Sequence, residues 1–208
     1  MNQIITISRE FGSGGRELGR RLAEALHIEY YDDEILRQIA ERTPFTEKYI
    51  QEVENHLPHR LHPISIGRSF LRADNYSFQQ AQSIFQEQSR ILREMAEKSD
   101  CVIVGRCADY VLREYNPYRI FVYADMESKV IRCKEKGTEQ NNLTEDQFGK
   151  SIRKIDKSRA KYYEFHTGMK WGDKANYDLC VNTSKISIKE FTPLLAQFFE
   201  LQSIVRGK

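Results

Sequence analysis

The sequence predicts a three-layer α/β/α domain whose central sheet has five, mostly parallel, strands. Two observations support this fold class. Short apolar runs alternate along the whole chain with longer segments whose apolar residues recur at helical spacing, as in folds where helices connect parallel strands. Several of the short runs are apolar at consecutive positions, which is typical of strands buried on both faces. A length of 208 residues favours one domain over residues 1–208, with a small insertion or lid, rather than two independent domains.

The first predicted strand, about residues 4–8, runs through a glycine cluster directly into a helical pattern. Such a loop leaves backbone N–H groups unpaired at the positive end of a helix dipole. Gly12, Ser13, Gly14 and Gly15 would let a phosphate approach those groups closely. The loop therefore predicts a phosphate cradle, and the alternative is a glycine-rich turn that binds no ligand.

The glycine loop departs from the P-loop pattern GxxxxGK[ST] at its cation. With Gly12 and Gly14 in the loop glycine positions, Gly15 stands where the lysine is expected and Arg16 follows one place later. Arg16 could still reach a phosphate from the first helical turn, as a planar donor rather than a point charge.

The second predicted strand, about residues 27–31, ends in acidic residues that precede another helix. Side chains just past a strand lie at the edge of an α/β sheet where ligands usually bind. Asp32 and Asp33 could therefore hold a sugar hydroxyl, a base or a metal-bound water. Alternatively, Asp33 caps the helix that follows.

Residues 43–76 lose the regular pattern, because prolines and a glycine interrupt them, and they indicate an insertion of short helices and loops. Arg68 and Arg72 have the spacing of helical neighbours and could clamp an anion, although a solvated helix face explains them equally well. Three histidines also lie here, but prolines break the helix that would present them on one face, so no metal site is predicted.

A long helix over residues 77–98 leads into an apolar strand, about residues 100–105, and then to Arg106. An arginine at the carboxyl end of a strand can point into the same crevice as the glycine loop. Another buried strand, about residues 119–124, and its helix follow. The last strand, about residues 177–183, precedes a helix whose apolar residues are expected to face the core, namely Phe191, Leu194, Leu195, Phe198 and Phe199.

A basic helix begins near Thr144, where Thr144-Glu145-Asp146-Gln147 has the form of a capping box. Its cations are Lys150, Arg153, Lys154, Lys157, Arg159 and Lys161. Asp156 lies among them and could orient Arg153 or Arg159 through an ion pair. The aromatic residues from Tyr162 onward suggest a loop that covers something. The alternative for the cations is the solvated face of a surface helix.

Composition limits the classes of function. The formal net charge of +2 is too close to balance for a general nucleic-acid binder, so functional positive charge must be local. No signal segment and no apolar run of about 20 residues is present, which favours a cytoplasmic protein without a membrane partner. The four cysteines form no CxxC pair, so we expect reduced thiols, mostly in the core, and neither a zinc site nor disulfides. Nothing in the sequence indicates an oligomeric state.

Several segments, taken in order, resemble a known family. They are ITISREFGSGGRELGRRLAEAL, YYDDEIL, VIVGRCADYVL, IRKIDKSRAKYY and NYDLCVNTS. Together they resemble the cytidylate kinase-like proteins of the P-loop nucleoside monophosphate kinase superfamily. The resemblance implies a P-loop NTPase-type core, a helical insertion over about residues 43–76 that receives the acceptor, and a lid over about residues 144–172.

The resemblance also implies roles for individual residues. The triphosphate would be bound by Gly12, Ser13, Gly14, Gly15, Arg16 and Glu17. The acceptor would be bound by Asp32, Asp33, Arg68, Arg72 and Arg106. Catalysis would depend on Arg16, Arg106, Arg153 and Arg159. The lid would also contribute Asp156, Lys157 and Tyr162.

The implied activity is transfer of a phosphoryl group from ATP, or another nucleoside triphosphate, to a nucleoside monophosphate or similar small acceptor. Mg²⁺ is expected with the nucleotide, although no dedicated protein ligand is identified. Both the loop lysine and the hydroxyl that usually follows it are missing. Glu17 occupies the neighbourhood where that hydroxyl would help to hold Mg²⁺, through water, but its carboxylate would repel phosphate oxygens. The alternative is a noncatalytic protein that binds or senses nucleotides.

Overall fold

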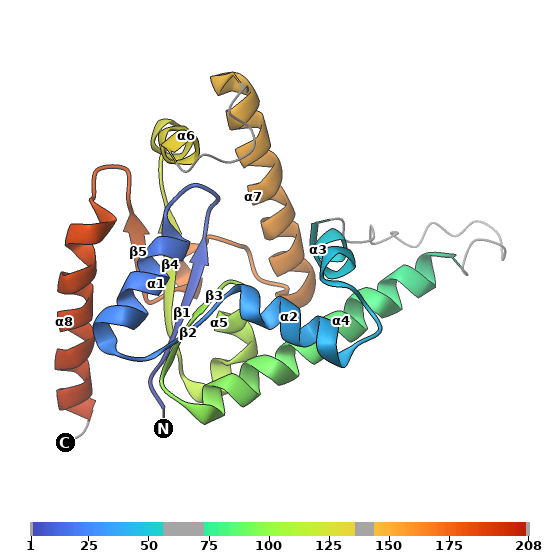
Figure 1. The fold of residues 1–208 in the computed structure, drawn as a ribbon, viewed down its shortest axis with the longest axis horizontal. Helices are drawn as coiled ribbons and strands as arrows, with labels where there is room; N and C mark the ends of the chain where they lie inside the picture. The colour runs from blue at the N-terminus through green and yellow to red at the C-terminus, as the bar shows by residue number, and fades with distance from the viewer. Residues whose placement is uncertain (1, 56–72, 136–143, 207–208) are drawn as a thin grey trace.

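The computed structural model describes residues 2–55, 73–135 and 144–206, and its centre is a parallel sheet (Figure 1). The strands lie in the order β2-β3-β1-β4-β5, and every pairing between neighbours is parallel. They are β1 (Ile4–Arg9), β2 (Glu29–Tyr31), β3 (Cys101–Val104), β4 (Tyr118–Tyr123) and β5 (Leu179–Asn182). The predicted three-layer fold is confirmed, with a sheet that is entirely parallel in the described part of the chain.

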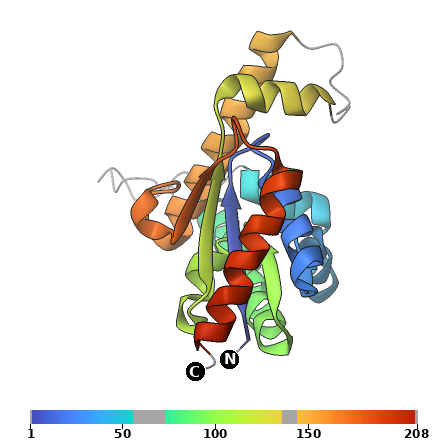
Figure 2. The ribbon, with the colours of Figure 1, turned by 90° about the vertical axis from the view of Figure 1, so that its left-hand side faces the viewer.

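Helices α1 (Gly15–Leu26) and α8 (Ile188–Arg206) cover one face of the sheet, and Figure 2 shows α8 running along it. Side chains alternate along β1, so Ile5 and Ile7 point to this face and pack in one cluster with Leu18 and Leu22 of α1. This packing fixes α1, and with it the glycine loop at its start, against the central strand.

The apolar face of α8 is narrower than predicted. Phe191, Leu195 and Phe199 pack on the core, as expected. Leu194 is 64% exposed and Phe198 is 39% exposed, so the expectation that both face the core is wrong. Leu194 directly precedes Leu195 along the helix, and consecutive helical residues cannot share a narrow buried stripe.

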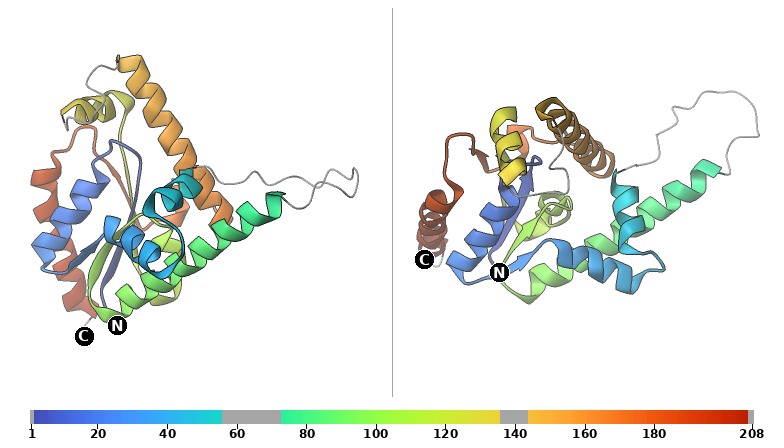
Figure 3. Two further views of the ribbon diagram at one scale, coloured as in Figure 1. Left: turned by 45° about the vertical axis from the view of Figure 1, so that its right-hand side comes forward. Right: turned by 45° about the horizontal axis from the view of Figure 1, so that its top comes forward.

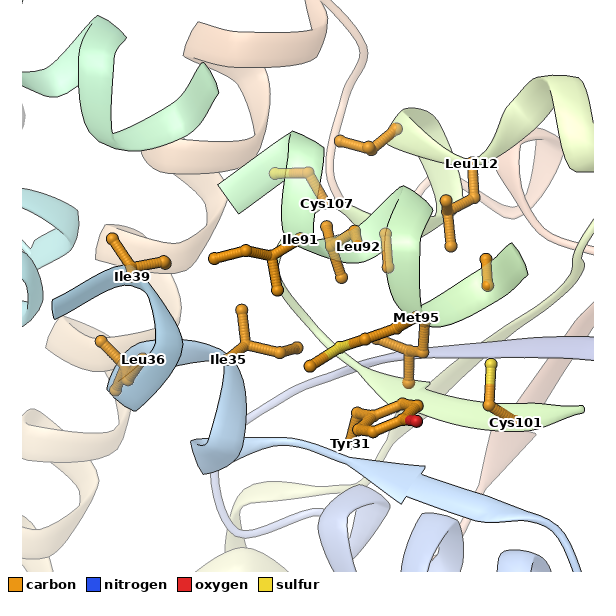
Figure 4. Packing of buried hydrophobic residues seen from close by; sticks show 14 of the residues in the cluster. Tyr31, Ile35, Leu36, Ile39, Ile91, Leu92, Met95, Cys101, Cys107 and Leu112 are labelled. Carbon is orange, nitrogen blue, oxygen red and sulfur yellow. The ribbon is translucent and has the colours of Figure 1, made fainter. Parts of the chain in front are cut away.

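The opposite face of the sheet is covered by α2 (Asp33–Arg42), α4 (Ala73–Lys98), the short α5 (Ala108–Val111) and the end of α7 (Glu145–Thr167). Figure 4 shows side chains of α2 and α4, such as Ile35 and Met95, meeting above Tyr31 and Cys101 of the sheet. Helix α3 (Glu47–Asn55) contributes Ile50 to the same cluster. Helix α4 contributes Ile84, Ile91 and Leu92, which are almost fully buried.

Helices α6 (Met126–Glu135) and α7 lie beyond the glycine loop, at the end of the molecule opposite the two termini (Figures 1 and 3). A small apolar cluster joins them through Val130, Cys133, Phe148 and Ile152. The predicted capping box of α7 is present, with the Thr144 side chain accepting from Gln147 N–H and the Gln147 side chain accepting from Thr144 N–H.

Helix α7 continues through its aromatic end to Thr167, and Gly168 terminates it in the left-handed conformation. The prediction that the aromatic residues from position 162 to 166 belong to a loop is therefore wrong. Short 3₁₀ turns at η1 (Arg113–Tyr115) and η2 (Lys174–Asn176) complete the described elements.

Part of the predicted insertion over residues 43–76 lies outside the described residues, including Arg68, Arg72 and the three histidines. The described part of this stretch contains α3, and α4 begins at Ala73, before the predicted start at residue 77. Within the described ranges, no helix combines the length and apolar character needed to cross a bilayer.

Candidate functional site

The glycine loop, residues 10–15, joins β1 to α1 and contains two glycines in the left-handed region. Gly12 has φ 76° and Gly14 has φ 82°, so an L side chain at either position would be strained. The Ser13 hydroxyl donates to Glu10 O at 2.8 Å, and Ser13 O accepts from the buried hydroxyl of Thr183 at 2.7 Å. Gly14, the N-cap of α1, offers no side-chain acceptor to the first helical N–H groups. The loop is thus held by contacts with Glu10 and Thr183, and no side chain caps the N-terminus of α1.

Four arginines line one cavity beside the glycine loop: Arg9, Arg16, Arg106 and Arg159. They come from the end of β1, the first turn of α1, the segment after β3, and α7. The carboxylates of Asp32, Asp33 and Glu54 line the same cavity. The structure therefore brings together three of the predicted arginines and both predicted aspartates, and it adds Arg9 and Glu54.

Asp32 and Asp33 hold Arg16. Arg16 Nε lies 2.5 Å from Asp32 Oδ2, and Arg16 Nη2 lies 3.0 Å from Asp33 Oδ1. The interpretation of Asp33 as a helix cap is wrong, because α2 already includes Asp33 and its carboxylate accepts from Arg16. Tyr30 donates to Asp32 at 3.2 Å, and burial together with this carboxylate raises the pKa of Tyr30 far above its usual value. The buried Asp32 is therefore a shared partner that orients the base of the cavity.

Arg106 is held in an unusual backbone conformation. Gly105, Arg106 and Cys107 follow one another in the left-handed region after β3, with φ values of 77°, 60° and 53°. Such conformations are costly without glycine and persist where the surroundings enforce them. Here the buried Gln88 side chain donates to Arg106 O at 2.9 Å.

The side chain of Arg106 pairs with Glu54 of α3. Burial acts most strongly against the charge of Arg106, but Glu54, Tyr162 and Asp32 together outweigh it, and the pKa of Arg106 is raised. The backbone turn thus aims a permanently charged guanidinium into the cavity, as predicted from the position of Arg106 at the end of a strand.

A carboxylate of α7 contacts the glycine loop directly. Asp156 Oδ1 accepts from Phe11 N–H at 2.6 Å, and Asp156 Oδ2 lies 3.0 Å from Lys129 Nζ. Lys129, from α6, is only 6% exposed and also lies 2.6 Å from Glu10 Oε2. One ion-pair network therefore joins the loop, α6 and α7.

Arg159 lies one helical turn after Asp156 and enters the cavity. Its Nη1 donates to Arg9 O at 3.1 Å. The same atom lies 4.0 Å from Asp156 Oδ1, so the predicted pairing of Arg159 with Asp156 is present as a loose ion pair. Burial lowers the pKa of Arg159, and the positive charges of Arg16 and Arg106 act in the same direction. Arg159 is thus a cation placed among other cations.

The remaining predicted residues of α7 and α1 divide between cavity and surface. Tyr162 is buried and lines the cavity, whereas Arg153 and Lys157 are exposed and do not line it. Glu17 pairs with Arg21 at 3.0 Å and lines a neighbouring, more open hollow that also contains Arg16 and both aspartates. Any role for Arg153, Lys157 or Glu17 in phosphate transfer stays a prediction.

Sequence reasoning missed Arg9, Glu54 and Lys129. Arg9 had a signal, because with Gly14 as the second glycine the spacing GxxxxG places the first glycine at residue 9, and the assignment of Gly12 to that position is wrong. Glu54 and Lys129 had none, since neither belongs to a motif and each reaches its partner only through the packing of distant helices.

The described residues contain no group of three or more His, Cys, Asp or Glu side chains that could hold a metal ion. The cysteines are free, with Cys101, Cys107 and Cys133 buried and Cys180 exposed, as expected for thiols used mainly in packing.

Comparisons with known proteins agree with this geometry. Residues 4–185 match the sequence model of the cytidylate kinase-like family. A cytidylate kinase of Haloarcula marismortui is 26% identical over 184 residues, covering 88% of this chain and 81% of the relative. Among solved structures, an uncharacterized protein from Eubacterium ventriosum is 27% identical with a TM-score of 0.67, covering 96% of this chain and 99% of that chain. A shikimate kinase from Bacteroides thetaiotaomicron shares the fold at 15% identity and a TM-score of 0.55, covering 95% of this chain and 98% of that one.

Proposed function

This chain belongs to the cytidylate kinase-like family, and we propose that it transfers a phosphoryl group from ATP, or another nucleoside triphosphate, to a nucleoside monophosphate or similar small acceptor. The observation that carries the proposal is the convergence of arginines from separate elements on one cavity beside the glycine loop. Phosphoryl transfer needs little covalent chemistry from a protein, because catalysis is chiefly alignment of the reactants and stabilisation of charge. Converging guanidinium groups supply both.

The proposed roles follow from where each group is attached. Residues Gly12–Gly15 and Arg16 would hold the triphosphate, since the loop offers backbone N–H groups at a helix N-terminus. Arg106 would orient the acceptor side, because Glu54 of α3 fixes its guanidinium there. Arg159 would stabilise the transferred group, since α7 brings it to the loop from the opposite side.

Asp32 and Asp33 have a double role in this proposal. With no anion bound they neutralise Arg16, which would otherwise lie close to Arg9, Arg106 and Arg159 without a counter-charge. A phosphate would compete for the same guanidinium donors, which would free an aspartate carboxylate to accept from a hydroxyl or base of the acceptor.

Mg²⁺ is part of the proposal through the family resemblance. The lack of a metal-binding group of three side chains in the described residues fits Mg²⁺, which is commonly held by one or two carboxylates together with substrate phosphates and water. Glu17 and Asp33, at the first turns of α1 and α2, are carboxylates that could take part. The ion would neutralise phosphate charge when bound.

The test is a coupled assay of ADP release from MgATP across ribonucleoside and deoxyribonucleoside monophosphates and small hydroxyl compounds. Arg159→Ala should lower kcat by about a hundredfold with a smaller change in KM, because a cation that acts on developing charge contributes mainly in the transition state. Lys161→Ala, an exposed cation on the same helix, is the matched control and should retain the wild-type rate.

Two outcomes would contradict the proposal. Binding of ATP without turnover on any acceptor would favour the alternative, a noncatalytic nucleotide-binding protein. That alternative is motivated by Gly15, which stands where the P-loop pattern has its lysine. Absence of nucleotide binding at millimolar concentration would exclude both.

A further inference from the structure

The chain differs from the P-loop pattern GxxxxGK[ST] at three positions, the first glycine, the lysine and the hydroxyl residue, and the structure connects the first two. Gly15 stands at the lysine position, and Arg9 stands at the first glycine position. A Cβ atom placed on Gly15 would lie 2.5 Å from Cβ and 3.1 Å from Cγ of Arg9, closer than real Cβ contacts allow. A side chain at position 15 and an arginine at position 9 therefore exclude each other.

The guanidinium of Arg9 lies in the cavity rather than in solvent. Its side chain is 17% exposed and crosses Gly105, where a Cβ atom would overlap the guanidinium. Gly105 thus makes room for Arg9 from the β3 side, as Gly15 does from the α1 side. Gly105, directly after β3, and Gly15, at the start of α1, leave one channel, and the side chain of Arg9 fills it.

Arg9 has little counter-charge of its own. Within the described ranges its acidic partner is Asp32, at 3.8 Å, and that carboxylate lies much closer to Arg16, at 2.5 Å. Burial and the nearby charge of Arg159 lower the pKa of Arg9 to about 9, so it is still protonated at neutral pH. A buried cation surrounded by cations is stabilised by an incoming anion.

Lys129 is another buried cation beside the loop, but its charge is already balanced. Its Nζ lies 2.6 Å from Glu10 Oε2 and 3.0 Å from Asp156 Oδ2, and it does not line the cavity. Of the two, Arg9 is therefore the one with charge available to a ligand.

We propose that Arg9 has taken over the role of the P-loop lysine, so that the phosphate-binding cation of this chain is attached at the first position of the GxxxxGK[ST] pattern instead of the seventh. The inference rests on the proposed function, since it names the residue that would bind the phosphates of the donor. A guanidinium at this place can donate to two phosphate oxygens at once, whereas a lysine acts as a point charge. Gly15 then serves to make room for the Arg9 side chain, and its presence does not indicate loss of phosphate binding.

The experiment measures binding of inorganic tripolyphosphate by calorimetry, together with the thermal unfolding midpoint of each variant. Arg9→Gln keeps the stem beside Gly15 but removes the charge, and it should weaken binding about ten- to a hundredfold. Arg90→Ala, which removes an exposed cation from α4, is the control and should bind like the wild type.

The exchange itself is tested with Arg9→Gly, Gly15→Lys and the double variant. Gly15→Lys alone should lower the unfolding midpoint because of its contact with Arg9, and Arg9→Gly alone should lose binding. The double variant restores the usual order of glycine and lysine and leaves only the 3.2 Å approach to Val122 Cβ, so it should regain most of the midpoint lost in Gly15→Lys and bind within a few-fold of the wild type.

The proposal is overturned if Arg9→Gln binds tripolyphosphate like the wild type, if the wild type does not bind it, or if the double variant is no better than Gly15→Lys. Its failure is distinct from failure of the proposed function. If tripolyphosphate binding depends on Arg9 but no acceptor is phosphorylated, the proposed kinase activity is wrong and the role of Arg9 stands. If an acceptor is phosphorylated at a rate that does not depend on Arg9, the kinase activity stands and the role of Arg9 is wrong.

Discussion

His166 should make the protein lose stability in mild acid, and replacing it with phenylalanine should remove that loss. The imidazole lies near the end of α7, stacked on Phe85 of α4 with ring centroids 3.9 Å apart and planes 9° apart. Tyr162 and Phe165 enclose it on other sides. Its Nε2 is buried and has no hydrogen-bond partner among the described residues. A charged imidazole has no compensation there.

The sign and size of the effect follow from the pKa. Burial lowers the pKa of His166 from 6.5 to about 4. As pH falls below 6.5, His166 becomes protonated in the unfolded chain but stays neutral in the folded chain. The free energy of unfolding therefore decreases until pH reaches about 4. Each pKa unit corresponds to about 1.4 kcal/mol, which gives about 2 kcal/mol at pH 5 and roughly 3 kcal/mol at pH 4. At pH 7.5 the contribution vanishes.

Urea unfolding of the wild type and of His166→Phe between pH 4.5 and 7.5 measures this directly. Phenylalanine fills the same aromatic site and takes up no proton. The free energy of unfolding of the variant, relative to that of the wild type, should therefore rise by about 2 kcal/mol between pH 7.5 and pH 5. His27→Asn removes an exposed histidine whose positive φ asparagine also accepts, and it should follow the wild-type profile. Parallel profiles for the wild type and His166→Phe would refute the reasoning.

Three further changes test the surroundings of the glycine loop. Asp156→Asn should lower the free energy of unfolding by about 1–3 kcal/mol, since Lys129 loses one of two carboxylates, whereas Asp146→Asn on the exposed face of α7 should change little in the same urea titration. Gly12→Ala should cost about 1–2 kcal/mol and weaken tripolyphosphate binding in calorimetry, because φ is 76° and the added Cβ would lie 3.0 Å from Lys129 O. Thr183→Val should cost about 1–2 kcal/mol in thermal unfolding, because its hydroxyl anchors Ser13 O at 2.7 Å. Wild-type stability in any of these variants would contradict the contact concerned.

The sequence is most informative where a single local rule decides the structure. Runs such as residues 101–104 are buried at every position and could be assigned to the sheet from composition alone. Arg106 could be placed at the ligand edge because the carboxyl ends of parallel strands share one edge. Contacts that depend on how helices pack could not be predicted. Glu54 meets Arg106 across 52 positions of sequence, and Asp156 meets the Phe11 amide across 145.

Arg9 shows why a motif can mislead when it is compared position by position. The pattern specifies which residue stands at each position, and at the lysine position this chain has Gly15. The pattern does not record which positions lie next to each other in the folded protein. In three dimensions positions 9 and 15 are neighbours, so a cation lost from one can be supplied from the other. The absence of a lysine therefore says less about activity than the sequence alone suggests.

The charges of the cavity and the position of α7 are linked through one backbone group. The cavity is lined by one more arginine than carboxylates, so the carboxylates hold the cations apart and oriented but do not fully neutralise them. Asp156 supplies a further negative charge just outside, on the Phe11 N–H, which belongs to the loop that would hold phosphate. A phosphate that bound this N–H would displace Asp156, and Asp156 is also the partner of Lys129 and a neighbour of Arg159. Filling of the glycine loop and the docking of α7 would then be coupled, because a single carboxylate takes part in both.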